Sequence, residues 1–451
     1  MTETAMNGRD EVRTAGEPRF ADAVRMWFKI GLLSFGGPAG QIALMHREVV
    51  ETRHWVDEQR FLHALNFCSL LPGPEAQQLA TYLGWLIHGA KGGWVAGLAF
   101  ILPGAAVMLV LSLIFVQFGD VGVVSALFFG LTCAVVAVVA HAVLRIAKKA
   151  LVGPVPWLAA AAAFVALFVF GVPFPVVVLA AGLLGLAIPG VFAAGTHGKA
   201  QDDSESLLDK LSRIDPGRAA RHVASARKSG ILALVLWAVP VLLLLPVGGL
   251  FSDVAVFFSK MAVVTFGGAY AVLSYVAQQA VENYAWLTAD EMLSGLGLAE
   301  TTPGPLILVL EFVGFLAGYG THGLAGAVLA ALLTLWVTFA PCFAFVFLGA
   351  PHIERIQKKP RLAGALAGIT AAVVGVIANM ALWFGLRVCF GELTVPAWAP
   401  SALELPVLSS VDPAAAAIVA VAVALLYSGK VGVVTLLGLC SVLGILARLA
   451  F

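Results

Sequence analysis

The sequence predicts an all-α integral membrane protein built from two homologous halves, and three observations lead to this prediction. Hydrophobic residues make up 60% of the 451 residues and charged residues 12%, whereas soluble domains contain about 45–50% and about 25%. Several apolar runs reach the length of about 20 residues that a helix needs to cross a bilayer. Rare residue types also recur at a fixed distance along the chain. Together these features exclude a soluble globular protein.

The N-terminal residues 1–20 are polar and include Arg9, Arg13 and Arg19. They contain no apolar stretch of the kind found in a cleavable signal peptide. Because positive residues collect on the cytoplasmic side of membrane proteins, we expect the N-terminus to be cytoplasmic.

An internal repeat divides the rest of the chain. The triplet 35–37 (FGG) returns at 266–268, and 72–74 (PGP) returns at 303–305, in both cases 231 residues later. We therefore expect a first repeat over residues 21–195 and a second over residues 250–451. Duplicated halves of this kind are frequent in transporters.

A polar linker is expected at 196–230, followed by one extra crossing helix at 231–249 that precedes the second copy. One added crossing turns everything after it over, so the second half is predicted to be inverted. The charges agree with this. The loop after the first FGG carries Arg47, Arg53 and Arg60, whereas its counterpart at 277–291 has no Lys or Arg.

Each FGG and PGP motif interrupts an apolar segment whose flanking pieces are about 14 residues long, too short to span about 30 Å of hydrocarbon. We therefore expect helices broken at these motifs and folded into four re-entrant hairpins. The alternative is that each broken segment crosses fully. Nine further runs are expected to cross, near 93–117, 121–144, 155–171, 174–194, 231–249, 324–348, 362–386, 413–428 and 431–449.

Several functional classes are excluded or disfavoured by missing motifs. The sequence has no GxxxxGK[ST] nucleotide loop, no HExxH, no GxSxG and no Cys/His cluster. The net charge of +1 gives no nucleic-acid footprint. We expect no enzymatic activity, no cofactor and no metal site.

The duplicated breaks are the candidate binding site. A broken helix presents free N–H groups with a partial positive charge, and glycine lets an anion approach the backbone closely. The alternative is that the glycines serve helix packing and the prolines make simple kinks. The candidate substrate-binding residues are Lys29, Ser34, Phe35, Gly36, Gly37, Asn66, Pro72, Gly73, Pro74 and Gln78 in the first half, and Lys260, Thr265, Phe266, Gly267, Gly268, Thr301, Thr302, Pro303, Gly304 and Pro305 in the second.

Three acidic residues near the PGP motifs, Glu75, Glu300 and Glu311, are candidates for proton coupling. Ionisable groups inside a membrane are costly and are therefore functional candidates. Glu75 and Glu311 also break the repeat symmetry, since Leu306 and Ala80 stand at the equivalent positions. An interface position or a salt bridge is the competing interpretation.

The stretch FGGPAGQIALMHREVVETRHWVDEQRFLHALNFCSLLPGPEAQQLATYLGW (35–85) and its echo at 266–305 resemble the chromate ion transporter family, in its long two-domain form. The resemblance implies efflux of chromate across the cytoplasmic membrane, driven by the proton motive force and giving chromate resistance, with sulfate as a competitor. Carried over by motif are the FGG and PGP residues, Pro38 and Gln78. Ala269 stands where the first half has Pro38, so the two halves need not bind ligand equally.

The sequence therefore predicts a secondary transporter that exports chromate by alternating access, driven by the membrane potential or the proton motive force, in the inner membrane. A transporter of sulfate or another oxyanion, an anion channel and a non-transporting scaffold remain alternatives. A homodimer is left open.

Overall fold

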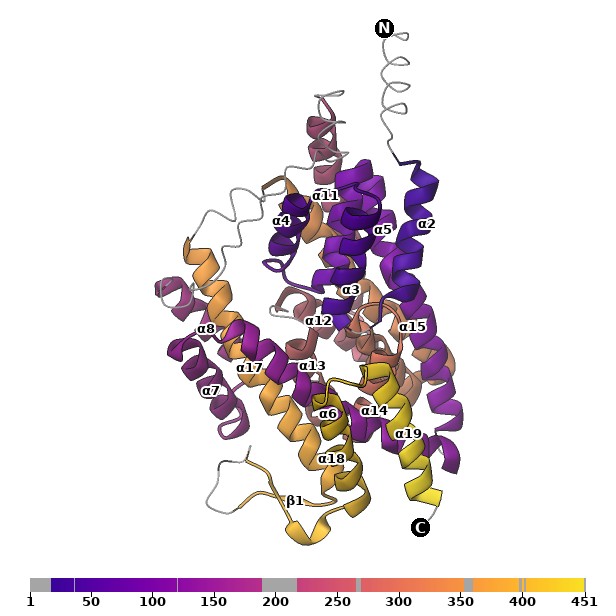
Figure 1. The fold of residues 1–451 in the computed structure, drawn as a ribbon. Helices are drawn as coiled ribbons and strands as arrows, with labels where there is room; N and C mark the ends of the chain where they lie inside the picture. Colours follow the sequence, from indigo (N-terminus) through magenta and orange to yellow (C-terminus); the bar gives the residue numbers. More distant parts are fainter. Residues whose placement is uncertain are drawn as a thin grey trace.

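The computed structural model describes residues 18–35, 37–119, 121–188, 217–264, 269–352, 360–396, 400 and 403–449, and it is almost entirely helical (Figure 1). Two short antiparallel strands, β1 and β2, lie between α17 and α18. The elements are α2 (Phe20–Leu33), α3 (Gly37–His46), η1 (Arg47–Thr52), α4 (Glu58–Cys68), α5 (Glu75–Phe118), α6 (Gly122–Ala150), α7 (Pro154–Phe168), α8 (Phe174–Ala187), α11 (Arg218–Leu244), α12 (Gly249–Val264), α13 (Ala269–Gln278), η2 (Gln279–Asn283), α14 (Ala289–Thr301), η3 (Leu306–Leu308), α15 (Val309–Gly349), η4 (Ala350–His352), α17 (Pro360–Cys389), β1 (Leu393–Thr394), β2 (Leu405–Pro406), η5 (Leu408–Ser410), α18 (Pro413–Tyr427) and α19 (Val433–Leu449).

Five helices of the described chain are long and apolar enough to cross a membrane, and they lie in α5, α6, α11, η3–α15 and α17. The protein is therefore a predominantly helical membrane protein. Each of the nine apolar runs expected to cross is helical over most of its length. Four of them, α7, α8, α18 and α19, have only 15, 14, 15 and 17 residues, which is shorter than the usual crossing helix. Their crossing stays a prediction.

The helices are broken where the motifs stand. In the first half α2 ends at Leu33 and α3 begins at Gly37, whose φ is +72°. In the second half α12 ends at Val264 and α13 begins at Ala269, and the predicted site residues 265–268 lie outside the described residues, as does Gly36. Both PGP motifs separate two helical segments, with φ of +119° at Gly73 and +92° at Gly304. Glycine supplies this left-handed backbone without a steric penalty.

The chain reverses direction at the first FGG break. Lys29 lies on α2 before the break, and Glu48 lies in η1 after it, yet their side chains form an ion pair with Nζ and Oε1 2.8 Å apart. If α3 continued in the direction of α2, the whole length of a helix from residue 29 to residue 48 would separate these two groups. Instead α3 runs back beside α2 toward the end of the molecule where α2 begins (Figure 1).

Each long helix, α5 and α15, is a hairpin of two helical arms rather than one rod. Non-helical backbone angles occur at His88–Gly89 in α5 and at His322–Gly323 in α15, with Gly89 at φ +64° and Gly323 at φ +62°. Within each hairpin the arms approach closely through glycines. A Cβ built on Gly84 would lie 2.4 Å from the Gly92 carbonyl oxygen, and one on Gly318 would lie 2.4 Å from the Gly326 carbonyl oxygen. These turns were not foreseen from the sequence.

The two His–Gly turns pack against equivalent helix starts. The His88 ring contacts Phe20 at the start of α2, with ring centroids 5.5 Å apart, and the His322 ring contacts Phe251 at the start of α12, at 5.4 Å. Gly89 also contacts His222, near the beginning of α11. From His222 to Leu244, five residues before α12, a helix extends about 33 Å. The two turns therefore lie toward opposite ends of α11.

Helix α11 begins earlier than expected. The predicted crossing starts at 231, but the helix starts at Arg218, so the end of the predicted linker is helical. The segment is rich in Ala, Arg and Ser and has no glycine or proline between 218 and 229 to stop a helix. The rest of the predicted linker, up to 216, lies outside the described residues, as do residues 1–17.

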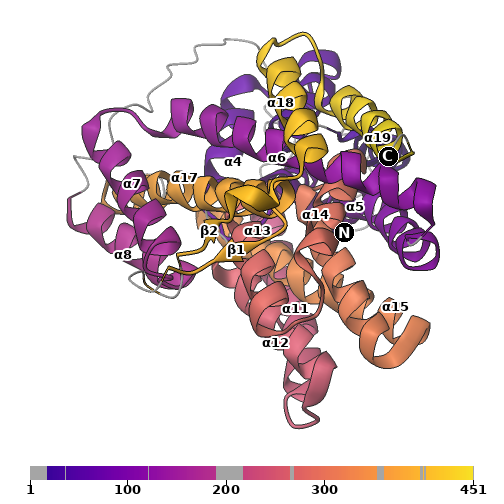
Figure 2. The same ribbon diagram turned by 90° about the horizontal axis from the view of Figure 1, so that it is seen from below.

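The two halves exchange their last helices. α7 and α8 of the first half pack on α17 of the second, and α18 and α19 of the second half pack on α6 of the first (Figure 2). Glycines allow both contacts, as is common between membrane helices. A Cβ on Gly130 would lie 2.0 Å from the Cys440 carbonyl oxygen, and one on Gly368 would lie 2.5 Å from that of Ala181.

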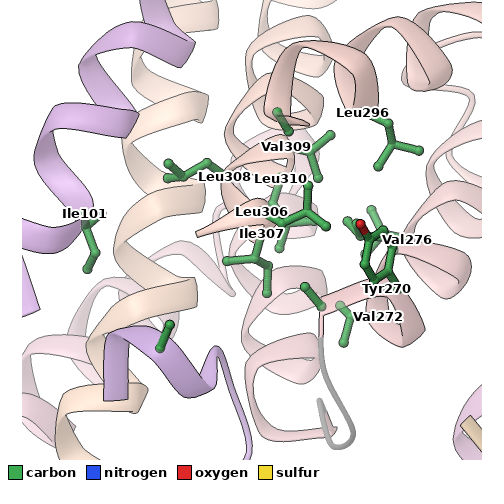
Figure 3. Packing of buried hydrophobic residues seen from close by; sticks show 14 of the residues in the cluster. Ile101, Tyr270, Val272, Val276, Leu296, Leu306, Ile307, Leu308, Val309 and Leu310 are labelled. Atoms are coloured by element: carbon green, nitrogen blue, oxygen red, sulfur yellow. The ribbon is translucent and has the colours of Figure 1, made fainter. Parts of the chain in front are cut away.

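The buried centre of the protein lies around the second PGP motif. Figure 3 shows Tyr270 and Val276 of α13, Leu296 of α14 and the run Leu306–Leu310 packed together, with Ile101 of α5 nearby. Residues 306–310 are at most 3% exposed. The second PGP motif is thus enclosed by apolar side chains.

Candidate functional site

The first FGG break and the second PGP motif meet directly. The Gly304 N–H donates to the Ser34 carbonyl oxygen at 2.9 Å. Gln41, on α3, donates its Nε2 to the Gly304 carbonyl oxygen at 2.6 Å and has a longer contact of 3.4 Å with the Ser34 carbonyl oxygen. Unwound backbone from one half is therefore bonded to unwound backbone from the other.

Each PGP motif packs against the long hairpin of the opposite half. A Cβ on Gly73 would lie 2.7 Å from the Cys342 sulfur in α15, and a Cβ on Gly104 in α5 would lie 2.1 Å from the Pro303 carbonyl oxygen. Gly104 and Cys342 each follow a proline, Pro103 and Pro341, inside their helix. The two contacts are equivalent under the repeat and leave little space around either motif.

The prolines and hydroxyls of the site are mostly enclosed. Gly73, Pro74, Pro303, Gly304 and Pro305 are buried, and Pro72 is half-buried. The Ser34 hydroxyl donates to the Ile30 carbonyl oxygen at 2.6 Å. The hydroxyls of Thr301 and Thr302 donate to the carbonyl oxygens of Leu298 and Ala299 at 2.8 and 2.9 Å. The one hydrogen of each hydroxyl is thus used at the end of its own helix, and only the acceptor lone pairs of the oxygens stay unused.

Other predicted residues lie away from this contact. Lys29 is paired with Glu48, and its side chain is 52% exposed. Lys260 and Asn66 are exposed on α12 and α4, and Phe35 is 39% exposed. The structure thus brings together the backbone of the breaks, whereas the two lysines stand outside it.

Five buried side-chain atoms have no hydrogen-bond partner within the described part of the chain. They are Gln41 Oε1, Gln77 Oε1, Gln78 Oε1, Glu311 Oε2 and Thr338 Oγ1. The amide nitrogens of the glutamines are bonded, that of Gln78 to the Pro72 carbonyl oxygen at 2.6 Å. Buried polar atoms without partners are costly, so such a group of them near the breaks indicates a ligand-binding or switching region.

The three candidate acids differ in their surroundings. Glu300 accepts a hydrogen bond from the Tyr270 hydroxyl at 2.6 Å and interacts electrostatically with Arg145. Glu75, half-buried at the start of α5, interacts electrostatically with Lys149. Glu311 is 1% exposed, and no cationic side chain of the described residues acts on it.

A charged cluster braces the turn after the first FGG break. Glu48 bonds both Lys29 and Arg53, and the Arg53 guanidinium lies over the Trp55 ring, 5.5 Å from its centroid. Burial raises the pKa of Glu48, but the hydrogen bonds and charges of Lys29 and Arg53 outweigh burial and leave the pKa below its ordinary value of 4.5. Glu48 is thus held as a carboxylate.

Two cavities lie on the side of η2 and the strand loop, away from the motif contact. One, of about 320 Å³, is lined by Gln278, Glu282, Asn379, Arg387 and Glu404 among others. The other, of about 870 Å³, includes Asp290, Glu291, Arg387, Asp412 and Arg448. Arg387 lies between the two, bonded to Glu404 at 2.6 Å. Neither cavity is lined by any of the FGG or PGP residues that the structure describes.

Several residues of this region were not singled out from the sequence, namely Gln41, Gly104, Tyr270, Thr338 and Cys342. The His–Gly turns could have been found, because the pair recurs 234 residues later (His88 and His322). Gln41 and Tyr270 gave no such signal, since the repeat does not conserve them. In the described part of the chain no group of three His, Cys, Asp or Glu is placed to hold a metal ion.

Comparison with known proteins divides the chain into the same two halves as the internal repeat. The profile of the chromate transporter family matches residues 21–186 and 252–445. The chromate transport protein of Pseudomonas aeruginosa is 34% identical over 357 residues, which cover 78% of this chain and 77% of that protein. The chromate transport protein of Cupriavidus metallidurans is 28% identical, covering 83% and 85%. An uncharacterized transporter of Methanocaldococcus jannaschii is 24% identical, covering 85% and 88%. No solved structure matches the chain.

Proposed function

This chain belongs to the chromate transporter family, and we propose that it exports chromate, a tetrahedral oxyanion, across the cytoplasmic membrane and so confers chromate resistance. The two bacterial relatives named as chromate transport proteins support chromate as the substrate. The observation that carries the proposal is the bond between the Gly304 N–H and the Ser34 carbonyl oxygen, because it joins two helix breaks from opposite halves at one buried point.

The transport mechanism is alternating access around this point. Chromate entering between the breaks competes with the Ser34 carbonyl for the Gly304 N–H and with backbone carbonyls for the amide of Gln41. Helix N-termini and free N–H groups favour an anion without needing a full positive charge. The candidate residues of the FGG and PGP motifs in both halves supply the remaining contacts. Lys29 joins the site when its pair with Glu48 opens.

The proposed topology is an inverted duplication with re-entrant hairpins and a cytoplasmic N-terminus. Its domains are residues 21–195, a cytoplasmic linker 196–230, an extra crossing 231–249 and the inverted repeat 250–451. The reversal of the chain between Lys29 and Glu48 supports the first hairpin. The placement of the His88 and His322 turns toward opposite ends of α11 supports the inversion.

The membrane potential alone supplies enough energy for export. Moving two negative charges out of an inside-negative cell gains about 4.6 kcal/mol per 100 mV, twice the value of about 2.3 for one charge. The proton motive force adds to this if an acid in the site carries protons, and Glu75, Glu300 and Glu311 are the candidates.

Transport of labelled chromate into inside-out membrane vesicles tests the proposal, with the pH gradient and the potential set separately and sulfate added as competitor. Uptake that saturates and shows counterflow supports a carrier. Flux without saturation or counterflow contradicts it and favours an anion channel. Sulfate uptake that exceeds chromate uptake favours the alternative of a sulfate or other oxyanion transporter. The mass of the purified protein in detergent tests the homodimer.

A further inference from the structure

The two long hairpins, α5 and α15, match each other in shape but differ in the polar residues that their arms bury. Both turn at a His–Gly pair, and both bring their arms together through a pair of glycines. In the second hairpin Glu311 stands on the first arm and Thr338 on the second. Counted from the His–Gly turns, which are 234 positions apart, the equivalent of Glu311 is Gln77; counted from Pro103 and Pro341, 238 positions apart, the equivalent of Thr338 is Phe100. The first hairpin thus has an amide where the second has a carboxyl group, and a phenyl ring where the second has a hydroxyl.

Glu311 and Thr338 lie at the same level of their hairpin. A Cβ on Gly314 would lie 2.2 Å from the Thr334 hydroxyl, which shows that the arms touch there. Glu311 comes three residues before Gly314 and Thr338 four residues after Thr334, so each lies one turn further along the same face of its antiparallel arm. Glu311 is 1% exposed and Thr338 is 2% exposed, so both are enclosed.

Both side chains keep a free polar atom. Glu311 Oε2 and Thr338 Oγ1 have no hydrogen-bond partner among the described residues. The run Leu306–Leu310 that leads into Glu311 is apolar and buried (Figure 3). An isolated carboxylate in such surroundings is very costly, whereas a carboxylic acid next to a hydroxyl is not. The site therefore holds a proton in this conformation.

In the described part of the chain, no positively charged group is placed to stabilise the ionised form of Glu311. Among the described residues, none of the ionisable side chains acts electrostatically on Glu311. Those on the elements packed against α15, and on α15 itself, are Glu75, Tyr82, His88, Lys91, Arg221, His222, Arg227, Lys228, Asp253, Lys260, Asp290, Glu291, Glu300, Tyr319, His322 and Cys342. Glu75 and Glu300 differ in this respect, because Lys149 and Arg145 act on them.

The pair is linked to the first PGP motif. The Cys342 thiol donates to the Thr338 carbonyl oxygen at 3.2 Å. The same sulfur lies where a side chain of Gly73 would be. A change in the arm around Thr338 therefore presses on, or releases, the backbone at the proposed chromate site.

We propose that Glu311 is the group that carries the coupling proton, that the Thr338 hydroxyl, unbonded in this conformation, donates to the carboxylate when Glu311 ionises, and that only the second hairpin has this acid. The proposal rests on the proposed transport function. When the carboxyl is open to the outer side it takes up a proton, and when it is open to the cytoplasmic side it releases that proton. One proton thus moves inward as chromate moves outward, with no other reactant.

Purified protein in liposomes tests this with two readouts, chromate flux and the internal pH reported by a trapped dye. In the native protein, we expect an outward chromate gradient to drive proton movement, and a pH gradient to accelerate chromate transport. Glu311→Gln should lose both effects, because the amide can neither take up nor release the proton. Asp253→Asn, at an exposed position of α12, is the matched control and should behave as the native protein.

Thr338 gives a second, independent measurement. Thr338→Val removes the hydroxyl that can donate to the ionised carboxylate, so the pH of half-maximal exchange should move upward, while Thr338→Ser should restore it. A structural role alone would leave that pH unchanged. Native protein that moves chromate without protons, or Glu311→Gln protein that keeps its response to the pH gradient, overturns the inference and leaves the transport function standing. Absence of any chromate flux in the native protein contradicts the transport function itself.

Discussion

Lys29 Nζ and Glu48 Oε1 lie 2.8 Å apart across the first FGG break, although 19 residues separate them in the sequence. The pair holds α2 and η1 together on one side of the break. Arg53 bonds the same carboxylate from the other direction. A residue that the sequence suggested as a ligand for chromate therefore serves, in this conformation, to fix the shape of the hairpin.

Replacing Glu48 with Gln should destabilise this hairpin at neutral pH. Because the pKa of Glu48 is lowered in the folded protein, its stabilising contribution is present above the unfolded value of 4.5 and is lost as the pH falls below it. Lys29 is half exposed, so we expect a loss of only about 1 kcal/mol. Thermal unfolding in detergent should separate the two proteins more at pH 7 than at pH 3.5. An equal difference at both values would contradict this account.

Gly104→Ala should disrupt the contact between α5 and the second PGP motif. The new methyl group would meet the Pro303 carbonyl oxygen at 2.1 Å, and a backbone atom cannot move aside cheaply. A shift of this kind costs about 1–3 kcal/mol. We expect a lower unfolding temperature and a loss of chromate uptake. Gly438→Ala in α19, where nothing lies within 4 Å of the new group, is the control and should be neutral.

Gln41→Leu should uncouple the two breaks while leaving the protein inserted in the membrane. The Gly304 carbonyl oxygen would lose its donor at 2.6 Å, at a cost of about 1–3 kcal/mol for a buried group. Vesicle uptake of chromate measures the effect, and membrane levels of the protein control for folding. Gln59→Leu, exposed on α4, serves as comparison. Native transport by the Gln41 variant would show that the bridge is not needed.

Gly37→Val should abolish transport because this residue begins α3 with a φ of +72°, which a β-branched side chain does not readily adopt. No atom lies within 4 Å of its Cβ position, so the effect comes from the backbone and not from a clash. Gly438→Val provides a control with the same change in side chain. Uptake at the native rate by the Gly37 variant would argue against a binding site made of backbone. The same outcome is expected for Gly268→Val, by the repeat.

The positions of the described helix breaks could be predicted from the sequence because helix breaks have a local cause. A Pro-Gly-Pro run stops a helix and a glycine pair weakens one, so the breaks after Leu33 and at 72–74 and 303–305 agree with the residues found there. Membrane location and the duplication follow in the same way, from composition and from the recurrence of rare residues. Family membership agrees with the motifs that suggested it.

What the tertiary structure decided is which surfaces meet. No local feature of the sequence predicts that Gly73 packs against Cys342 or that Gly104 packs against Pro303. The same is true of α18 and α19, which pack on α6 of the other half. The physical reason is that apolar helices in a membrane have no hydrophobic preference for one apolar neighbour over another. Their pairing depends on how small residues on distant segments fit together, and on which buried polar atoms find partners. Those relations exist only once the chain has folded.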